Sequence, residues 1–206
     1  HNVPIWLRQA PLSSCILEVT SAHQRHGGGG AFYVYAGGIA VNKTLTINME
    51  NTTMALNSSA ASGGIGYAQG GQLADGSGLP TLTLNMTHVT CGRNTGTGNA
   101  INYGLYFNRT HGSAANNLNF NAYNSIFVGA GTITARGINF AFAQSPNFIN
   151  NVSSDLQNVD NIVNDLNNIT GLTAGQIGIP SALTDEGGFS NVLALTPAGD
   201  AVDHCT

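Results

Sequence analysis

The chain has 206 residues, of which six are Lys or Arg and ten are Asp or Glu, so its net charge is −4. So few cations exclude the basic patch that binds nucleic acid or an anionic membrane surface. No apolar run approaches the roughly 18 residues that span a bilayer. Apolar residues still make up 42% of the chain, which is enough to fill a core. With 27 Gly and 25 Asn residues besides, this composition indicates an extracellular or cell-surface β-protein.

The first 12 residues are largely apolar and are interrupted by prolines, and we interpret them as an N-terminal extension or cap. Ile5, Trp6 and Leu7 form its most apolar stretch. These three side chains are candidates either for packing onto the first repeat of their own chain or for a subunit contact with a neighbouring molecule.

Internal similarity is the main signal in residues 13–150. Residues 44–53, 81–90 and 117–126 align without gaps at spacings of 37 and 36 residues, and a fainter copy lies at 15–20. In each segment apolar side chains alternate with polar ones, as in a strand with one buried face. Each copy is followed by a Gly-rich corner and a second short strand, expected at residues 31–35, 65–67, 100–107 and 137–142.

A fixed period that returns the same side chains to the same positions favours stacked repeats over an antiparallel sandwich. We therefore predict an all-β fold in which residues 13–150 form a right-handed parallel β-helix. Asn48, Asn85 and Asn121 recur at one repeat position, and Asn51 and Asn124 recur at another. Stacking of the repeats would bring these amides into ladders.

Residues 151–206 are predicted to close the fold as an irregular segment that includes one short helix. Ser153 and Ser154 precede apolar residues at positions 156, 159, 162, 163 and 166, which is the spacing of an amphipathic helix with a Ser N-cap.

The cysteines and the glycosylation sequons are consistent with an extracellular location. No Cys-x-x-Cys pair occurs, which gives no support to a zinc or thioredoxin-type site. The three cysteines either supply one intrachain disulfide with a free or intermolecular thiol, or are three buried thiols, and the candidates are Cys15, Cys91 and Cys205. Seven Asn-x-Ser/Thr sequons permit N-glycosylation, at Asn42, Asn51, Asn57, Asn85, Asn108, Asn151 and Asn168.

A polysaccharide-cleaving site would need two carboxylates beside a glycosidic bond, or acidic calcium ligands with a basic residue. Between residues 12 and 150 the acids are Glu18, Glu50 and Asp75. The repeat places Thr87 and Tyr123, not a second acid, at the position of Glu50. Candidates for binding an acidic sugar are Arg93, Arg109 and Arg136. We predict no enzymatic activity, no cofactor and no metal site.

The C-terminal stretch resembles the closing motif of secreted bacterial β-helix proteins of the polymorphic outer-membrane-protein-like or choice-of-anchor Q type. The matching residues are Asp185, Gly187, Gly188, Leu193, Leu195, Pro197, Ala201 and Asp203. The family's repeat motif is similar to residues 28–30, 44–53 and 81–90, so the resemblance covers about residues 13–205. Thr-Pro-Ala-Gly-Asp at 196–200 departs from the family's usual Pro-Gly-Ser-Pro. The resemblance implies a right-handed parallel β-helix and a surface location, not a reaction.

The sequence thus predicts a non-catalytic extracellular protein with a structural or adhesive role, whose partner is either itself or a cell-surface glycan. Head-to-tail docking through residues 1–12 would produce surface filaments. The alternative function is a carbohydrate-binding or polysaccharide-degrading β-helix protein. The aromatic residues of the second strands either stack in the core or form an exposed stripe for sugar stacking.

Overall fold

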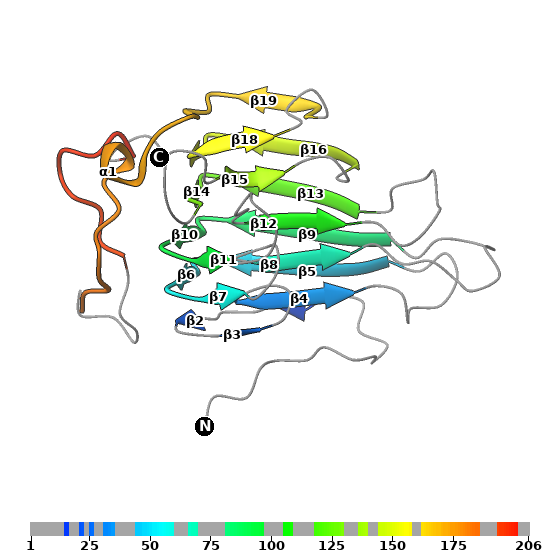
Figure 1. Cartoon of the computed structure of the whole chain (residues 1–206). Helices are drawn as coiled ribbons and strands as arrows, with labels where there is room; N and C mark the ends of the chain where they lie inside the picture. The colour runs from blue at the N-terminus through cyan, green and yellow to red at the C-terminus, as the bar shows by residue number, and fades with distance from the viewer. Residues whose placement is uncertain are drawn as a thin grey trace.

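In the part of the chain that the structure describes, almost all regular structure is β-strand (Figure 1). The computed structural model describes residues 15–16, 21–22, 25–26, 31–35, 44–59, 66–69, 81–96, 105–108, 118–129, 136–139, 144–157, 162–185 and 193–201. Within these ranges the strands pair in four sheets, and every pairing is parallel.

Each sheet takes its strands from successive repeats of the sequence. Sheet A contains β1 (Cys15–Ile16), β5 (Thr44–Glu50), β9 (Thr81–Thr87), β13 (Leu118–Tyr123), β16 (Gln144–Ile149) and β19 (Asn164–Leu166). Sheet B contains β2 (Ser21–Ala22), β6 (Thr53–Ala55), β10 (Thr90–Gly92), β14 (Ile126–Phe127) and β17 (Val152–Ser153). Sheet C contains β3 (Arg25–His26), β7 (Ser58–Ser59) and β11 (Thr95–Gly96). Sheet D contains β4 (Phe32–Tyr35), β8 (Gly66–Gln69), β12 (Leu105–Asn108), β15 (Arg136–Asn139) and β18 (Asp155–Gln157).

The strand register follows the repeats read from the sequence. Thr44 pairs with Thr81, and all seven residues of β5 and β9 stay in that register. Leu82 pairs with Leu118, so the sequence spacing between paired residues is 36 here instead of the 37 between Thr44 and Thr81. The spacings of 37 and 36 residues are therefore confirmed, as are the all-β class and the second strands β4, β8, β12 and β15.

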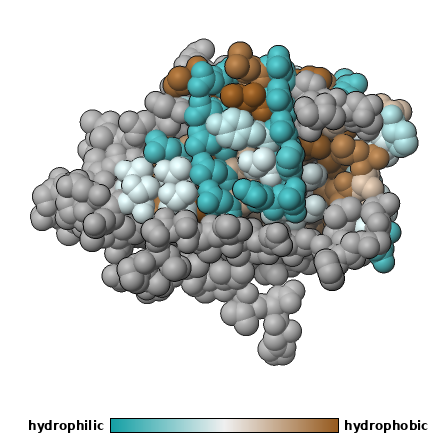
Figure 2. Space-filling model, turned by 180° about the vertical axis from the view of Figure 1, so that it is seen from behind, coloured by the Kyte–Doolittle hydropathy of each residue, from teal (hydrophilic) through white to brown (hydrophobic). Residues whose placement is uncertain are grey.

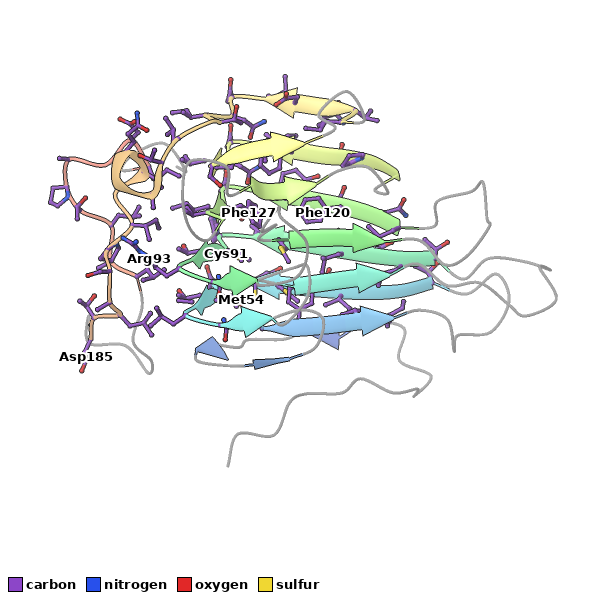
Figure 3. All side chains as sticks on the ribbon, viewed as in Figure 1. Met54, Cys91, Arg93, Phe120, Phe127 and Asp185 are labelled. Carbon is purple, nitrogen blue, oxygen red and sulfur yellow. The ribbon has the colours of Figure 1, made fainter. Side chains whose placement is uncertain are left out.

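The alternation of apolar and polar residues builds the core between the sheets. Along β9 every second residue is buried, beginning with Leu82. Phe127 packs between Phe120 and Phe148, with ring centroids 6.3 and 6.0 Å apart. Figure 3 shows Phe120 and Phe127, together with Met54 and Cys91, pointing inward between the sheets. Burial of these large side chains supplies the main stabilisation of the stack.

The helix predicted after Ser153 does not form, and that prediction is wrong. The chain instead forms β17, β18 and β19, so strand pairing extends past residue 150, where we had expected the repeats to end. The amide of Val152 donates to the carbonyl of Ser125 over 2.9 Å, and that of Ser154 donates to Phe127 over 3.0 Å. A short amphipathic helix is marginal by itself, and here pairing with the preceding repeat takes precedence over it.

One short helix, α1 (Ala174–Ile177), occurs among the described residues, in the segment that follows the last strand. Thr173 and Gln176 form a capping box at its start, and Gly178, with φ 87°, ends it in the left-handed conformation. This C-terminal segment lies along the outer face of sheet B (Figure 1). Ile177, Ile179 and Leu193 pack there against an apolar cluster from sheet B and its flanks, namely Ala55, Ile126, Val128 and Val152.

Two contacts fasten the C-terminal segment to the sheets. The guanidinium of Arg93 donates from Nε to the carbonyl of Pro180 over 2.8 Å and from Nη2 to that of Ile179 over 2.9 Å. A Cβ on Gly199 would lie only 2.5 Å from the carbonyl oxygen of Ile177, so the backbones meet there without room for a side chain.

Candidate functional site

The outer face of sheet A carries the most regular array of polar side chains among the described residues. Asn85 Nδ2 donates to Asn48 Oδ1 over 2.7 Å, Asn121 Nδ2 donates to Asn85 Oδ1 over 2.7 Å, and Asn147 Nδ2 donates to Asn121 Oδ1 over 2.5 Å. Asn164 continues the series by donating to Asn147. We call these five residues the asparagine ladder. The expected stacking of Asn48, Asn85 and Asn121 is confirmed and extends through two further repeats.

A second polar column lies at the corner between sheets A and B. Its members share a left-handed backbone conformation with φ between 48° and 55°, namely Asn51, His88, Asn124, Asn150 and Asn167. Asn and His accept this conformation at lower cost than most residues, which explains their recurrence. We call these five residues the corner column. Asn124 Nδ2 lies 3.3 Å from His88 Nε2, so the residue between Asn51 and Asn124 in the predicted stack is a histidine.

Between the two columns runs a line of side chains that we call the central strip. It contains Glu50, Thr87, Tyr123, Ile149 and Leu166, which are register partners in successive strands. Figure 2 shows the result from behind: two teal columns cross the strands, and the strip between them changes from polar at the bottom to apolar at the top. The face combines amide edges with one half-buried tyrosine ring and few charges.

A third set of polar side chains points inward at the corners and is buried. Asn151 Oδ1 accepts from the backbone amide of Ser125 over 2.9 Å, and its Nδ2 donates to the carbonyl of Ala122 over 3.0 Å. Asn94 likewise binds a backbone group at the corner between sheets B and C. Its Oδ1 accepts hydrogen bonds from the backbone amide and from Nδ2 of Asn57. These side chains satisfy backbone groups where the chain turns and the strand ladder is interrupted.

Sequence reasoning did not identify Asn147 and Asn164 in the ladder, or Asn151 and Asn168 at the inner corner. A usable signal existed in the dipeptides Asn150-Asn151 and Asn167-Asn168. In each, the first Asn takes the left-handed corner and the second points inward.

The predicted sequons occupy very different environments. Asn57 and Asn151 have no exposed surface, so a glycan on either side chain is incompatible with this fold. Asn85 belongs to the asparagine ladder, and Asn168 Nδ2 donates to both the carbonyl of Phe148 and Asp165 Oδ1. Asn51 is exposed. Asn42 lies outside the described residues, and of Asn108 only the backbone position in β12 is described.

The cysteine candidates are only partly described. Cys91 is a free thiol with no exposed surface. Burial raises the pKa of this thiol, which keeps it protonated and unreactive. The backbone of Cys15 pairs with Ile47 in sheet A. Cys205 and the candidate subunit contacts Ile5, Trp6 and Leu7 lie outside the described residues.

The described residues bring together no acid pair suited to hydrolysis beside Glu50, whose register partner is Thr87. In this part of the chain no three His, Cys, Asp or Glu side chains are grouped in a way that would hold a metal ion. Nor does any helix there have the length and apolarity needed to cross a membrane. Arg93, a candidate for binding acidic sugar, instead binds two backbone carbonyls of the C-terminal segment (Figure 3).

Comparison with known proteins adds no relative to this picture, because no family model, curated protein or solved structure matches the chain.

Proposed function

We propose that this chain is a non-catalytic extracellular protein with a structural or adhesive role, and that its sheets are the sides of a right-handed parallel β-helix. The cyclic order of the strands supports this architecture, since β5, β6, β7 and β8 each pair with the equivalent strand of the next repeat, in sheets A, B, C and D. The resemblance of the closing motif to secreted β-helix proteins is part of the same proposal.

The asparagine ladder is the observation that carries the proposed role. Five amides are bonded in series from repeat to repeat, so each is held in one orientation at the strand spacing of about 4.8 Å. A primary amide has two donor hydrogens and two acceptor lone pairs. Each interior member uses one of each in the ladder, and the remaining groups form an ordered array on a half-exposed face.

This array suits adhesion to a neutral glycan better than it suits catalysis. The amides offer hydrogen bonds to sugar hydroxyls, and Tyr123 and Ile149 of the central strip offer apolar surface for the C–H face of a sugar ring. Among the residues of the asparagine ladder and the central strip, the charged one is Glu50, in the second repeat. The polysaccharide-degrading alternative lacks a second carboxylate in register with Glu50.

Filament formation, the second structural hypothesis, meets an obstacle at β19. Met49, Met86, Ala122 and Phe148 follow one another in the core column of sheet A, and the next register partner is Asp165. A charge in the core column of a short edge strand opposes the addition of a further strand. Head-to-tail docking would therefore have to use a surface other than this column.

Binding to insoluble neutral polysaccharides, measured with purified full-length protein, tests the adhesive role. Binding that falls at least tenfold in Tyr123→Ala is the expected result, with Ser181→Ala as the matched control because Ser181 is exposed on the C-terminal segment. Negative-stain electron microscopy of the same sample tests the structural role through the presence of fibres. Dispersed particles that bind no polysaccharide would contradict both roles, and release of soluble sugar would favour the degrading alternative.

A further inference from the structure

The corner residue Asn51 is the exposed one among the five sequon asparagines whose side chains the structure describes. It begins the sequon Asn51-Thr52-Thr53 and lies at the corner between β5 and β6 with φ 48°. Its backbone amide donates to the carbonyl of Thr87 over 3.2 Å, whereas its side chain bonds to no other described residue. A substituent on Nδ2 therefore extends into solvent without breaking a bond that holds the fold.

The other four sequon asparagines whose side chains the structure describes are held by hydrogen bonds, for reasons that differ. Asn57 and Asn151 are completely buried, and their Nδ2 atoms donate to Asn94 Oδ1 and to the carbonyl of Ala122. Both hydrogens of Asn168 Nδ2 are engaged, one with Phe148 and one with Asp165. Asn85 Nδ2 donates to Asn48 Oδ1 and Asn85 Oδ1 accepts from Asn121 Nδ2, so a sugar on this Nδ2 would crowd the neighbouring amides of the asparagine ladder.

We propose that Asn51 is the N-glycosylation site among these five sequons. In the transfer, Asn51 Nδ2 forms a bond to C1 of an oligosaccharide carried on a lipid pyrophosphate. The bond between C1 and the pyrophosphate oxygen breaks, the amide nitrogen loses one proton, and the lipid pyrophosphate leaves. The inference rests on the extracellular location in the proposed function, because this donor is met on the secretory route.

The order of glycan transfer and folding explains why only some of the sequons should carry sugar in the folded protein. The hydroxyl residue of the acceptor, Thr53, is buried in the folded chain, so transfer to Asn51 must precede folding. All seven sequons are then accessible to the transferase. A chain modified at Asn57 or Asn151 cannot bury that side chain afterwards, and it loses the corner hydrogen bonds of the fold. Secreted, folded molecules should therefore carry sugar at Asn51 and not at the buried sites.

Glycopeptide mapping of the full chain, secreted from a eukaryotic cell line behind a cleavable signal, tests the proposal. Enzymatic removal of N-glycans in ¹⁸O water converts each modified Asn to labelled Asp. We expect label at Asn51 and none at Asn57, Asn85, Asn151 or Asn168. Label at either buried site in secreted protein, or an unlabelled Asn51, would overturn the assignment.

A pair of glycine variants provides the matched control. Asn51→Gly keeps the left-handed corner and should lose one glycan in mass, while Asn150→Gly, at the same corner position outside any sequon, should lose none. Efficient secretion with an unmodified Asn51 would refute this inference alone. Retention of the wild-type chain inside the cell would refute the extracellular location as well.

Discussion

Replacement of Asn151 by alanine removes two buried corner hydrogen bonds and leaves two backbone groups without their side-chain partner. These are the amide of Ser125 and the carbonyl of Ala122, bonded to Asn151 over 2.9 and 3.0 Å. A buried polar group that loses its partner costs about 1–3 kcal/mol. The carbonyl oxygen of Ala122 has a second lone pair, so losing its hydrogen bond costs less free energy than leaving the amide of Ser125 without a partner. We expect the free energy of unfolding to fall by about 2–4 kcal/mol.

Urea and thermal unfolding of wild type, Asn151→Ala and Asn119→Ala measure this effect. In a chain of this size about 1 kcal/mol corresponds to roughly 2–4 °C in Tm, so Asn151→Ala should melt several degrees below wild type. Asn119 is the control: it lies half-buried in sheet A and makes one weak bond of 3.3 Å to Thr83 Oγ1, so its loss should cost less than about 1 kcal/mol. Equal losses in the two variants would refute the assignment of Asn151 as a corner support.

Four further predictions concern the core, the C-terminal segment and the last strand. Because burial raises the pKa of the Cys91 thiol, the stabilisation from this thiol is complete below the ordinary thiol pKa near 8.5. Above that pH the free energy of unfolding should fall by about 1.4 kcal/mol per pH unit. Urea unfolding at pH 7.5 and pH 10 should show this fall in wild type and a smaller fall in Cys91→Ala. Gly199→Ala places a Cβ 2.5 Å from the carbonyl oxygen of Ile177 and should cost more than about 2 kcal/mol, seen as a lower Tm. Arg93→Lys loses the guanidinium that donates to two backbone carbonyls, so limited proteolysis should cleave the C-terminal segment faster than in wild type. An unchanged cleavage rate would contradict the role of Arg93 in fastening this segment. Asp165→Leu should raise the sedimentation coefficient through self-association, while Asp165→Glu, which keeps the charge, should not.

The sequence was sufficient for the register of β5, β9 and β13, for a physical reason. Parallel pairing of similar repeats places equivalent residues side by side in neighbouring strands. The gap-free alignment of the segments that begin at Thr44, Thr81 and Asn117 therefore predicts which side chains are neighbours. Alternation then assigns each residue to the core or to the outer face, as in the inward Leu82 and the outward Asn85.

The later repeats were not predictable by the same method, because the repeat shortens. Asn121 and Asn147 are 26 residues apart, and Asn147 and Asn164 only 17. A fixed period near 36 cannot detect these partners. The short intervals also brought apolar residues into a spacing that resembles a helix, which led to the wrong prediction at Ser153. Pairing between repeats is a long-range interaction, and local spacing carries no information about it.

The abundance of sequons has a structural origin that the sequence did not reveal. A left-handed corner favours Asn, an inward corner favours a side chain that both donates and accepts, and the strand that follows is rich in Thr and Ser. Asn57, Asn151 and Asn168 satisfy the sequon pattern through these requirements alone. These three sequons therefore occur where the Asn side chain forms hydrogen bonds at a corner of the chain. Asn51 differs from them because its side chain is exposed.

The shortening of the repeats also explains how the stack ends. Among the described residues, sheet C takes strands from the first three repeats and sheet D ends with β18, whereas β19 extends sheet A and a single bridge between Val152 and Ile169 extends sheet B past β17. Val163, directly before β19, is 62% exposed. The end is nonetheless protected, since Asp165 occupies the core column and accepts a hydrogen bond of 2.6 Å from Asn168 Nδ2. The amide of Asn168 that completes the inner corner thus also binds the carboxylate of Asp165. We expect this charge to oppose the addition of a further strand, which favours the proposed adhesive role over growth through this end.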